Sequence, residues 1–451
     1  MSFTTAIAGL NAQSEKLNSA GNNIANSQTV GYKRSDVLFA DVFAASRGIG
    51  VQVSDVRQNF TQGSIESTGR NLDLAISGEG FYRLERSTGE VGYSRNGEFG
   101  ITAAGDIVNA QGDRLMGYGM DRGITVDTDD QQAFPFSNVL VGGAPQALNV
   151  PVDDIPAKAT TEVNALLNLD ARVVSGQDLN TVEISESDAD AEANPPVVTP
   201  LNYHFSNNFT SYDSLGNAVN VATYFERVGD NSNQWNVTAV TNGVTRGSFT
   251  LDFTESGRLR TNADGVVTGI GENANLGGGA VVIEDPETDE TRVTIGGIPG
   301  GVDAAALDIQ FKFNGSTQFA ADSLQKELNQ DGFTSGALAG ITVTETGVIQ
   351  RNFTNGETRA AGQIALASFR NEEGLQPLGN NLWAATNTSG LENLGAPGTG
   401  RLGQIQAEAV EASNVDLASE LVDTIVAQRS YQANSNTIST QDELLQTIIN
   451  L

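Results

Sequence analysis

Residues 3–24 read FTTAIAGLNAQSEKLNSAGNNI, and this stretch decides the fold of the N-terminal end. Its apolar side chains recur on one alternating spacing of three and four residues, at Phe3, Ile7, Leu10, Leu17 and Ile24. Such a spacing places the side chains on a narrow stripe along one side of a helix, which is the pattern of a seam between paired helices. We therefore predict an amphipathic helix at the start of the chain.

The C-terminal end carries a second stripe of the same kind. Residues 413–451 contain neither Pro nor Gly, and Ser413 with Asp416 three residues later predicts the start of a long helix. Its apolar seam positions are Leu417, Leu421, Tyr431, Ile438, Leu445 and Ile449. Two narrow stripes at opposite ends of one chain favour coiled-coil pairing and predict polymerisation through both ends. The alternative is that each helix packs back on its own core, as amphipathic helices commonly do.

The chain between the helical ends is predicted to be mainly β. Residues 220–225 and 234–240 partly alternate apolar and polar side chains, and Gly, Asn and Asp separate such runs. Residues 362–369 are typical of a buried strand, which would pair with residues 71–134 if the middle of the chain is an insertion. The pair Asn96-Gly97 predicts a type I′ hairpin turn.

Proline indicates where the chain changes domain, because seven of the eleven prolines lie between positions 135 and 200. The predicted parts are a terminal helical polymerisation domain (1–30 plus 405–451), an extended linker (31–70), an inner β domain (71–140 plus 325–404) and an inserted outer β domain (141–324). The predicted fold class is α+β, with mainly β globular domains and long N- and C-terminal helices that pair as a coiled coil.

The charge balance excludes several classes of partner. Lys and Arg number 25 and Asp and Glu 55, which gives a formal net charge of −30. This charge repels phosphate backbones and anionic lipid, and no apolar run is long enough to span a bilayer, so we expect neither nucleic-acid binding nor membrane insertion.

Residues for catalysis are scarce. The chain has no Cys, and His204 is its only His, so thiolate chemistry is excluded and acid–base or metal sites lose their usual residues. No nucleotide-binding glycine motif occurs, and the acidic run 127–130 lacks the Gly and the closing Glu of a calcium loop. We predict no catalytic, cofactor-binding or metal-binding residues and no enzyme activity.

Short motifs at both ends closely resemble those of one family, the flagellar rod and hook axial proteins of bacteria. The residues that carry the resemblance are Asn22, Asn23, Ala25, Asn26, Gly31, Tyr32, Lys33, Asn414, Val415, Asp416, Gln428 and Arg429. Within the family, the length of the chain and the segments 212–217 and 374–383 are similar to hook members, because rod members generally lack so large a middle domain.

The resemblance implies a structural subunit without a cofactor, which polymerises into the flexible tubular universal joint between the flagellar motor and the filament. It implies a homopolymer in the form of a helical tube. The other implied partners are the flagellar rod, the hook cap, the hook–filament junction proteins and the type III export apparatus. Linker residues Asp36, Phe39, Asp41 and Phe43 are expected to make further contacts between subunits.

Location follows from the same resemblance. Residues 1–6 lack a basic region followed by an apolar run, so we expect export to the extracellular flagellum without a cleaved signal peptide. Two alternatives stay open: a distal rod protein of the same family, and a secreted β protein that binds a ligand or acts as an enzyme.

Overall fold

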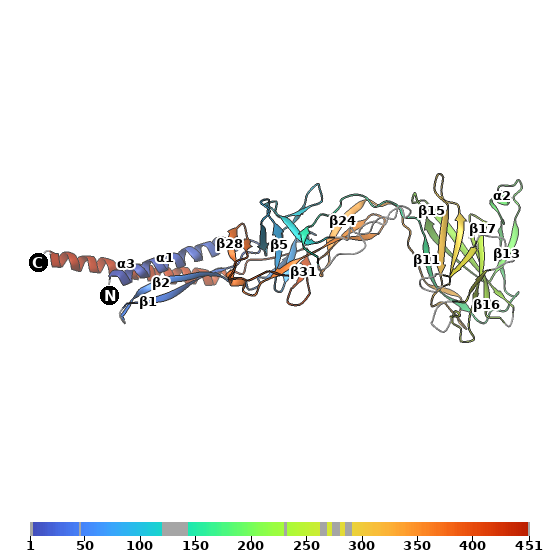
Figure 1. Cartoon of the computed structure of the whole chain (residues 1–451). Coiled ribbons are helices and arrows are strands. Elements are labelled where there is room, and N and C mark those ends of the chain that lie inside the picture. The colour runs from blue at the N-terminus through green and yellow to red at the C-terminus, as the bar shows by residue number, and fades with distance from the viewer. Residues whose placement is uncertain are drawn as a thin grey trace. The chain divides into compact units, whose positions relative to one another are not determined.

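The computed structural model describes residues 3–44, 47–119, 143–229, 232–261, 268–272, 280–284 and 291–449. The chain divides into two compact units, of which the first comprises residues 1–153, 339–352 and 358–451 and the second residues 154–338 and 353–357. Strands dominate both units, and a long helix lies near each end of the chain (Figure 1). The α+β class is therefore confirmed.

The first unit contains the two long helices and the residues on either side of the insertion. Its N-terminal elements are α1 (Phe3–Ala25), β1 (Ser35–Ala44), β2 (Arg47–Gln58), β3 (Ile65–Ser67), β4 (Leu74–Ser77), β5 (Phe81–Glu85), β6 (Val91–Ser94), β7 (Gly100–Ile101), β8 (Ile107–Val108), β9 (Arg114–Tyr118) and β10 (Gln146–Ala147). Its C-terminal elements are β24 (Leu338–Val343), β25 (Val348–Phe353), β26 (Thr358–Ile364), β27 (Leu366–Ser368), the 3-10 helix η1 (Glu372–Gly374), β28 (Gln376–Gly379), β29 (Leu382–Ala384), β30 (Asn393–Gly395), β31 (Gln404–Ala407), β32 (Ala409–Glu411) and α3 (Leu417–Ile449).

Early and late segments of the first unit share one sheet, whose main path runs β24-β25-β26-β9-β5-β6-β29-β28. Strand β26 pairs with β9 and β27 pairs with β5, which is the pairing predicted for residues 362–369. The segment is divided between two strands at Ala365. Apolar side chains of this sheet, among them Tyr82, Leu115 and Ile364, are almost fully buried and belong to one core cluster of the first unit.

The pair Asn96-Gly97 does not form the predicted type I′ turn, because neither residue has a positive φ. Asn96 Oδ1 instead accepts a hydrogen bond from the Glu98 backbone N–H at 2.9 Å. A Cβ on Gly97 would lie 1.6 Å from the Leu74 carbonyl oxygen, so the glycine allows a close approach of two backbones. A tertiary contact, rather than a hairpin turn, accounts for this Gly.

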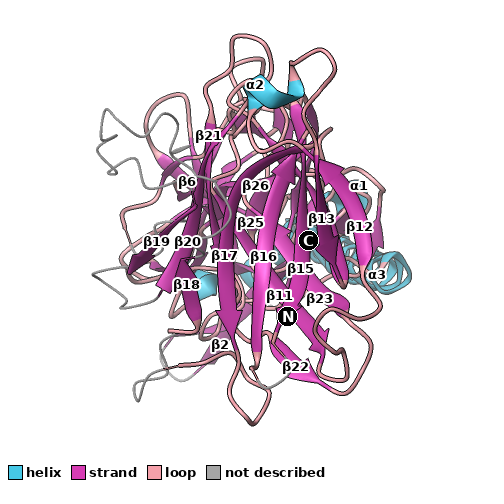
Figure 2. Cartoon of the chain, turned by 90° about the vertical axis from the view of Figure 1, so that its right-hand side faces the viewer, coloured by secondary structure: helices cyan, strands magenta, loops and turns pink. Residues whose placement is uncertain are grey.

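The second unit is built almost entirely of strands. Its elements are β11 (Glu162–Asp170), β12 (Asn180–Ile184), α2 (Asp188–Ala191), β13 (Thr199–Tyr203), β14 (Phe205–Tyr212), β15 (Ala218–Val228), β16 (Gln234–Thr241), β17 (Val244–Asp252), β18 (Ile270–Glu272), β19 (Ala280–Glu284), β20 (Thr291–Ile298), β21 (Leu307–Lys312), β22 (Thr317–Phe319) and β23 (Leu324–Gln330). Figure 2 shows β15, β16 and β17 side by side.

Two sheets of the second unit enclose its core. One has the order β14-β15-β16-β17-β18, and the other β19-β20-β21-β11-β22 with β23 also paired to β11. Inward-pointing side chains of both sheets meet in one apolar cluster, and Phe225, Trp235 and Phe249 within it are 0% exposed. Alternation of buried and exposed residues along β15 accounts for the one-sided burial, as the sequence pattern predicted.

Asp213 joins two loops of the second unit through a fully buried carboxylate. The carboxylate accepts hydrogen bonds from the backbone N–H groups of Leu215, Asn217 and Gly301 and from Asn217 Nδ2, at 2.7–2.9 Å. Burial alone would raise the pKa of Asp213, but these hydrogen bonds outweigh it and hold the pKa below its usual 3.8.

Helix α3 begins three residues later than the Ser413 start predicts. Asp416 caps the helix, because its Oδ1 accepts a hydrogen bond from the Ala418 backbone N–H at 3.0 Å. The Ser413 hydroxyl instead accepts a hydrogen bond from the Val415 N–H in the preceding turn.

Candidate assembly surface

Helices α1 and α3 lie side by side (Figure 1). Lys16 Nζ is 3.7 Å from the Asp423 carboxylate, and a Cβ on Gly9 would lie 2.7 Å from Asn434 Nδ2. Position 16 of α1 thus meets the start of α3 and position 9 meets its middle, so the helices are antiparallel. Ala427, which is 0% exposed, is the most deeply buried side chain of α3.

Small and polar residues form the buried side of each helix. The buried and half-buried positions follow their own alternation of three and four residues, Thr5, Gly9, Ala12, Lys16, Ser19 and Asn23 on α1 and Glu420, Asp423, Ala427, Ser430, Asn434, Thr437 and Gln441 on α3. The predicted apolar seam occupies different positions on both helices. The single chain therefore places small and polar residues at its inward heptad positions and leaves the apolar stripes largely outside.

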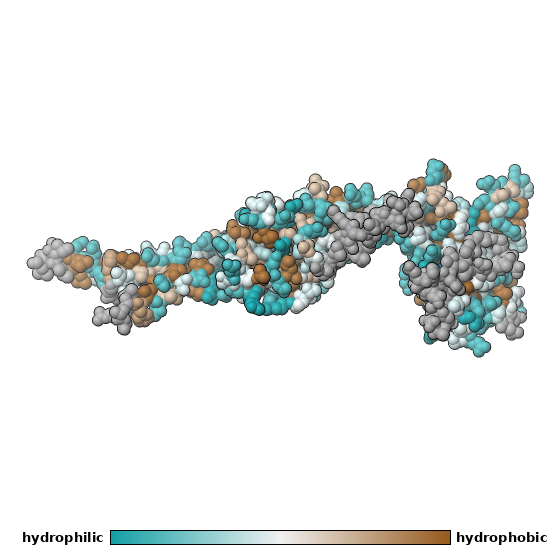
Figure 3. Space-filling view, in the orientation of Figure 1, coloured by the Kyte–Doolittle hydropathy of each residue, from teal (hydrophilic) through white to brown (hydrophobic). Residues whose placement is uncertain are grey.

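The predicted seam residues are mostly accessible to solvent. Phe3, Ile7, Leu417, Leu421, Tyr431 and Leu445 are exposed, whereas Leu10, Leu17, Ile24 and Ile438 are half-buried. The side chain of Ile449 lies outside the described part of the chain. Four further exposed apolar residues of α3, which the heptad pattern did not select, are Val422, Ile425, Val426 and Leu444. Figure 3 shows brown apolar residues along this end of the first unit.

The predicted linker contains a long antiparallel hairpin of β1 and β2, in which Val37 pairs with Val56 and Phe39 with Val53. Gly50 allows α1 to lie on the hairpin, because a Cβ there would be 2.8 Å from the Ala8 Cβ. The outward side chains Phe39, Phe43, Val53 and Val56 are 39%, 65%, 37% and 47% exposed. The hairpin thus adds an apolar surface of its own beside α1. Asp36 is ion-paired with Arg34, and Asp41 is exposed.

Asn23 fixes the direction in which the chain leaves α1. Its side chain donates to the Ser35 carbonyl and accepts from the Ser35 N–H, both at 3.0 Å, and it also accepts from the Tyr32 hydroxyl at 3.2 Å. Ser19 one helical turn earlier donates to the same Ser35 carbonyl at 2.8 Å. The amide therefore holds β1 against the end of α1. An alanine at position 23 would leave the Ser35 N–H without this acceptor, whereas the Ser35 carbonyl would keep the Ser19 hydroxyl.

Gly31 turns the chain where it meets the inner sheet. Its φ is +69°, and a Cβ would lie 2.5 Å from the Asn96 backbone nitrogen. Its N–H donates to the Glu411 carbonyl at 2.7 Å. Both the left-handed backbone and the close approach require glycine at this position.

Lys33, Glu411 and Arg95 form a buried charge cluster next to the turn at Gly31. Lys33 Nζ lies 2.6 Å from Glu411 Oε1, and Arg95 Nη1 lies 3.3 Å from Glu411 Oε2. The side chains of Lys33 and Glu411 are both 0% exposed and that of Arg95 is 2% exposed. The Gly63 N–H also donates to Glu411 Oε1, and Lys33 donates to the Thr61 carbonyl, each at 2.8 Å.

The cluster joins three parts of the first unit. Lys33 lies between α1 and β1, Arg95 follows β6, and Glu411 ends β32 just before α3. Burial lowers the pKa of Lys33, and the Glu411 carboxylate partly offsets that shift. One carboxylate thus connects both helical ends with the inner sheet.

Asn414 makes a second connection beside the cluster. Its Oδ1 accepts from the Arg34 N–H at 2.8 Å, and its Nδ2 donates to the carbonyls of Asn59 and Thr61 at 2.8 and 3.0 Å. The motif residues Asn23, Gly31, Tyr32, Lys33 and Asn414 are therefore structural residues of the junction between the helices, the hairpin and the sheet. Asp416 caps α3 next to this junction.

The remaining motif residues do not belong to this network. Asn22, Ala25, Gln428 and Arg429 are exposed on the helices, while Val415 and Asn26 are half-buried. Asn26 Nδ2 donates to the Asn22 carbonyl at the end of α1, and Asn26 Oδ1 accepts from the Thr29 hydroxyl.

Sequence reasoning missed Glu411 and Arg95 as junction residues. They are 316 positions apart, and an isolated Glu or Arg carries no local pattern. A charged residue at the end of the apolar run Ala409-Val410 was the one available signal of a buried carboxylate.

Within the described ranges, no group of three or more His, Cys, Asp or Glu side chains is placed to hold a metal ion. No helix among the described residues is long and apolar enough to cross a membrane.

Four family profiles match successive parts of the chain. They are flagella basal body rod protein (residues 3–33), flagellar hook protein FlgE/F/G D1 domain (75–141), flagellar basal body protein FlaE D2 domain (178–333) and flagellar basal body rod FlgEFG protein C-terminal (406–451).

Curated relatives match along their whole length. The flagellar hook protein FlgE of Escherichia coli K12 is 37% identical over 457 residues, and that of Salmonella typhimurium LT2 is 38% identical over 452 residues, with 100% of both chains covered in each case. A crystal structure of Helicobacter pylori flagellar hook protein FlgE2 is 13% identical, covers 77% of this chain and 100% of its own, and has a TM-score of 0.49. The family of this chain is shown by the full-length sequence matches.

Proposed function

Because the chain belongs to the flagellar hook protein family, we propose that it is a structural subunit of the bacterial flagellar hook. In this proposal many copies polymerise into a flexible tube that transmits motor torque to the filament. The terminal helices pair with those of neighbouring copies along the inside of the tube, and the β domains form the outer layers.

The apolar surface of α3 carries the proposal. Its exposed large apolar side chains are 41–61% exposed, and they are Leu417, Leu421, Val422, Ile425, Val426, Tyr431, Leu444 and Leu445. Covering half of such a side chain contributes about 1 kcal/mol, so these eight contribute about 8 kcal/mol in total. An association of two proteins costs about 4–15 kcal/mol in lost freedom. The gain from one such contact is thus comparable to this cost, whereas a tube gives each helix several neighbours.

The hairpin β1–β2 supplies a second apolar surface in the proposal. Phe39 and Phe43 are two of the four linker residues that the sequence predicted as intersubunit contacts, and both are exposed next to Val53 and Val56. Asp41 is exposed beside them. In the tube, this surface lies against another copy.

Torque has to pass from the helices to the outer β domains, and the contacts that join them have to keep their geometry under this load. The Lys33–Glu411–Arg95 cluster and Asn414 suit this task, because buried charges with several hydrogen bonds resist displacement. In the proposal, the junction is the rigid part of each subunit and bending occurs where copies slide past one another.

The family supports a non-enzymatic subunit located in the flagellar hook and basal body. The proposal also includes export by the type III apparatus without a cleaved signal. It further includes contacts with the rod, the hook cap and the hook–filament junction proteins. The distal rod alternative is not favoured, because the full-length relatives are named hook proteins.

Polymerisation of the purified chain tests the proposal. Negative-stain microscopy and sedimentation after a salt or concentration increase should give tubes for the unsubstituted chain. Ile425→Ser, within the exposed apolar surface of α3, should reduce the sedimenting fraction at an unchanged melting temperature. Thr88→Ala, at an exposed β turn away from the helices, should polymerise normally. Equal polymer yield from both variants would show that the exposed apolar surface of α3 does not hold the polymer.

A further inference from the structure

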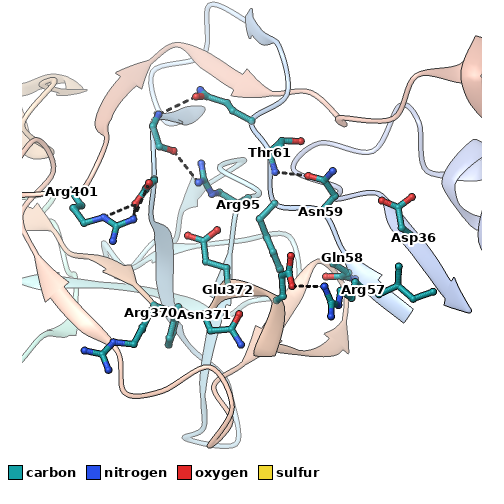
Figure 4. Close-up of a pocket in the computed structure, with 17 residues that line it drawn as sticks. Asp36, Arg57, Gln58, Asn59, Thr61, Arg95, Arg370, Asn371, Glu372 and Arg401 are labelled. Atoms are coloured by element: carbon teal, nitrogen blue, oxygen red, sulfur yellow. Dashed lines mark hydrogen bonds and ion pairs between the residues drawn. The ribbon is translucent and has the colours of Figure 1, made fainter. Parts of the chain in front are cut away.

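Residues 402–414, the last extended segment before α3, form a strap that binds the N-terminal half of the first unit. Within the strap, β31 pairs with β4 and β32 pairs with β3. Arg401, the residue directly before the strap, lines a polar cleft of about 880 Å³ (Figure 4) and is ion-paired with Glu79 at 2.9 Å. These partners all precede the insertion at residues 154–338.

The strap lies on the N-terminal half at positions where the two backbones almost touch. A Cβ on Gly63 would lie 2.0 Å from the Ala412 carbonyl oxygen, and a Cβ on Gly403 would lie 2.4 Å from the Ser77 carbonyl oxygen. The Ala412 N–H donates to the Ser64 carbonyl at 2.8 Å. Glycine at positions 63 and 403 therefore allows the strap to dock, because any side chain there meets the opposite backbone.

The strap also supplies partners to the residues that follow α1. The Gly31 N–H donates to the Glu411 carbonyl, the Lys33 ammonium is paired with the Glu411 carboxylate, and the Arg34 N–H donates to Asn414. Without the strap, Gly31 and Arg34 lose these acceptors and Lys33 loses its carboxylate. The position of α1 and of the hairpin on the sheet thus depends on a segment near the other end of the chain.

The N-terminal half of the first unit shares its core with residues that follow the insertion. One core cluster combines Tyr82 and Leu115 with Ile405 of the strap, and β9 and β5 pair with β26 and β27. The ion pair between Arg401 and Glu79 alone joins residues 322 positions apart. Closing such a loop costs conformational entropy before the contacts compensate for it, so docking of these late segments is intrinsically slow.

The second unit closes within one stretch of chain. Apart from residues 353–357 it is continuous from residue 154 to residue 338, and the buried residues of its core cluster lie between Val163 and Phe313. The segments by which the chain enters and leaves it are also paired, because the Ile155 N–H donates to the Gly336 carbonyl at 2.9 Å. This unit has its core and its closing contact without the strap.

We propose that the strap is a folding latch, a segment whose docking completes the fold of the first unit, whereas the second unit folds by itself. In a chain that starts unfolded, the junction and both assembly surfaces then form last. A subunit with an undocked strap has no fixed position for α1 or for the hairpin and is not competent to polymerise. This inference goes beyond the proposed function, because it concerns the folding of the single chain.

The two tryptophans of the chain report on the two units separately, because Trp235 is buried in the second unit and Trp383 in the first. Trp383→Phe and Trp235→Phe each leave a single reporter in the full-length chain. After dilution from denaturant, the Trp235 fluorescence should recover first, and the Trp383 fluorescence about tenfold or more slowly. Equal rates, or faster recovery of Trp383, would overturn the inference.

A substitution on the docking site of the strap gives an independent test at equilibrium. Gly63→Val leaves the strap itself unchanged but places a side chain against the Ala412 carbonyl. In this variant the Trp383 emission should be that of the unfolded chain, while the Trp235 emission stays native.

Gly100→Val is the matched control in the same unit, because a Cβ at Gly100 meets nothing within 4 Å. Both tryptophans of the control should keep their native emission. Native emission of both tryptophans in Gly63→Val, or unfolded emission of both, would overturn the inference. Neither measurement involves the polymer, so failure of the unsubstituted chain to polymerise would overturn the proposed function and leave the latch intact.

Discussion

Replacing Glu411 by alanine should destabilise the first unit more than any surface substitution. The change leaves Lys33 and Arg95 as buried cations without their shared carboxylate, and it also removes the acceptor of the Gly63 N–H. Removing one member of a buried ion pair costs about 3–5 kcal/mol. For a unit of this size, each kcal/mol lowers the melting temperature by about 2–4 °C, so we expect a fall of about 6–20 °C.

Thermal and denaturant unfolding of the subunit, followed by circular dichroism, measure this loss. Glu90→Ala is the matched control, because Glu90 is also ion-paired, at 3.1 Å from Arg86, but is 70% exposed. Exposed pairs contribute about 0–1 kcal/mol, so the control should stay close to the unsubstituted protein. A loss for Glu411→Ala no larger than that of the control would refute the reasoning about the buried cluster.

Three further outcomes follow from the described geometry. Gly31→Ala, which combines φ of +69° with a Cβ 2.5 Å from the Asn96 nitrogen, should cost about 1–3 kcal/mol in denaturant unfolding, and more than Gly69→Ala, where φ is +72° but the space is open. Asp213 has a pKa below its usual 3.8, so its contribution to the free energy of unfolding is complete above about pH 5 and is lost as the pH falls. Asp213→Asn should therefore flatten the dependence of the free energy of unfolding on acid pH, and it should cost about 1–3 kcal/mol at pH 7. Leu421→Ser, at a side chain that is 52% exposed, should change the free energy of unfolding by no more than about 0.5 kcal/mol while it weakens polymerisation. A loss of subunit stability that matches the loss of polymer would argue that Leu421 packs within its own chain.

The sequence predicted both helices and the strand-rich middle, because helical and strand periodicities are local properties. It also predicted that residues 362–369 return to pair with the segment before the insertion. The two-unit division places the insertion at residues 154–338, later than the expected 141–324. Composition marks a loop region and not the residue at which the chain enters a new core.

Periodicity could not identify the residues that make the contact between α1 and α3. Gly9, Ser19 and Asn434 are buried or half-buried there, but such residues give no apolar signal, so the pattern selected Phe3 and Leu417 on exposed faces instead. Glu411 and Arg95 meet only after the inner sheet has formed. The turn at Asn96-Gly97 was predicted wrongly for a related reason, because the backbone of Leu74 determines its shape.

The residues of the polymerisation seam and the intersubunit role of the hairpin remain proposals of the same account. They share one physical basis: apolar side chains exposed in the single chain lose contact with water when copies assemble.

Electron microscopy of cells lacking only this gene, and of basal bodies purified from them, tests the central claim most directly. The account predicts complete rods without hooks or filaments, and restored hooks when the gene is returned. Truncated rods would place the protein in the rod, and intact flagella would contradict its role as the hook subunit.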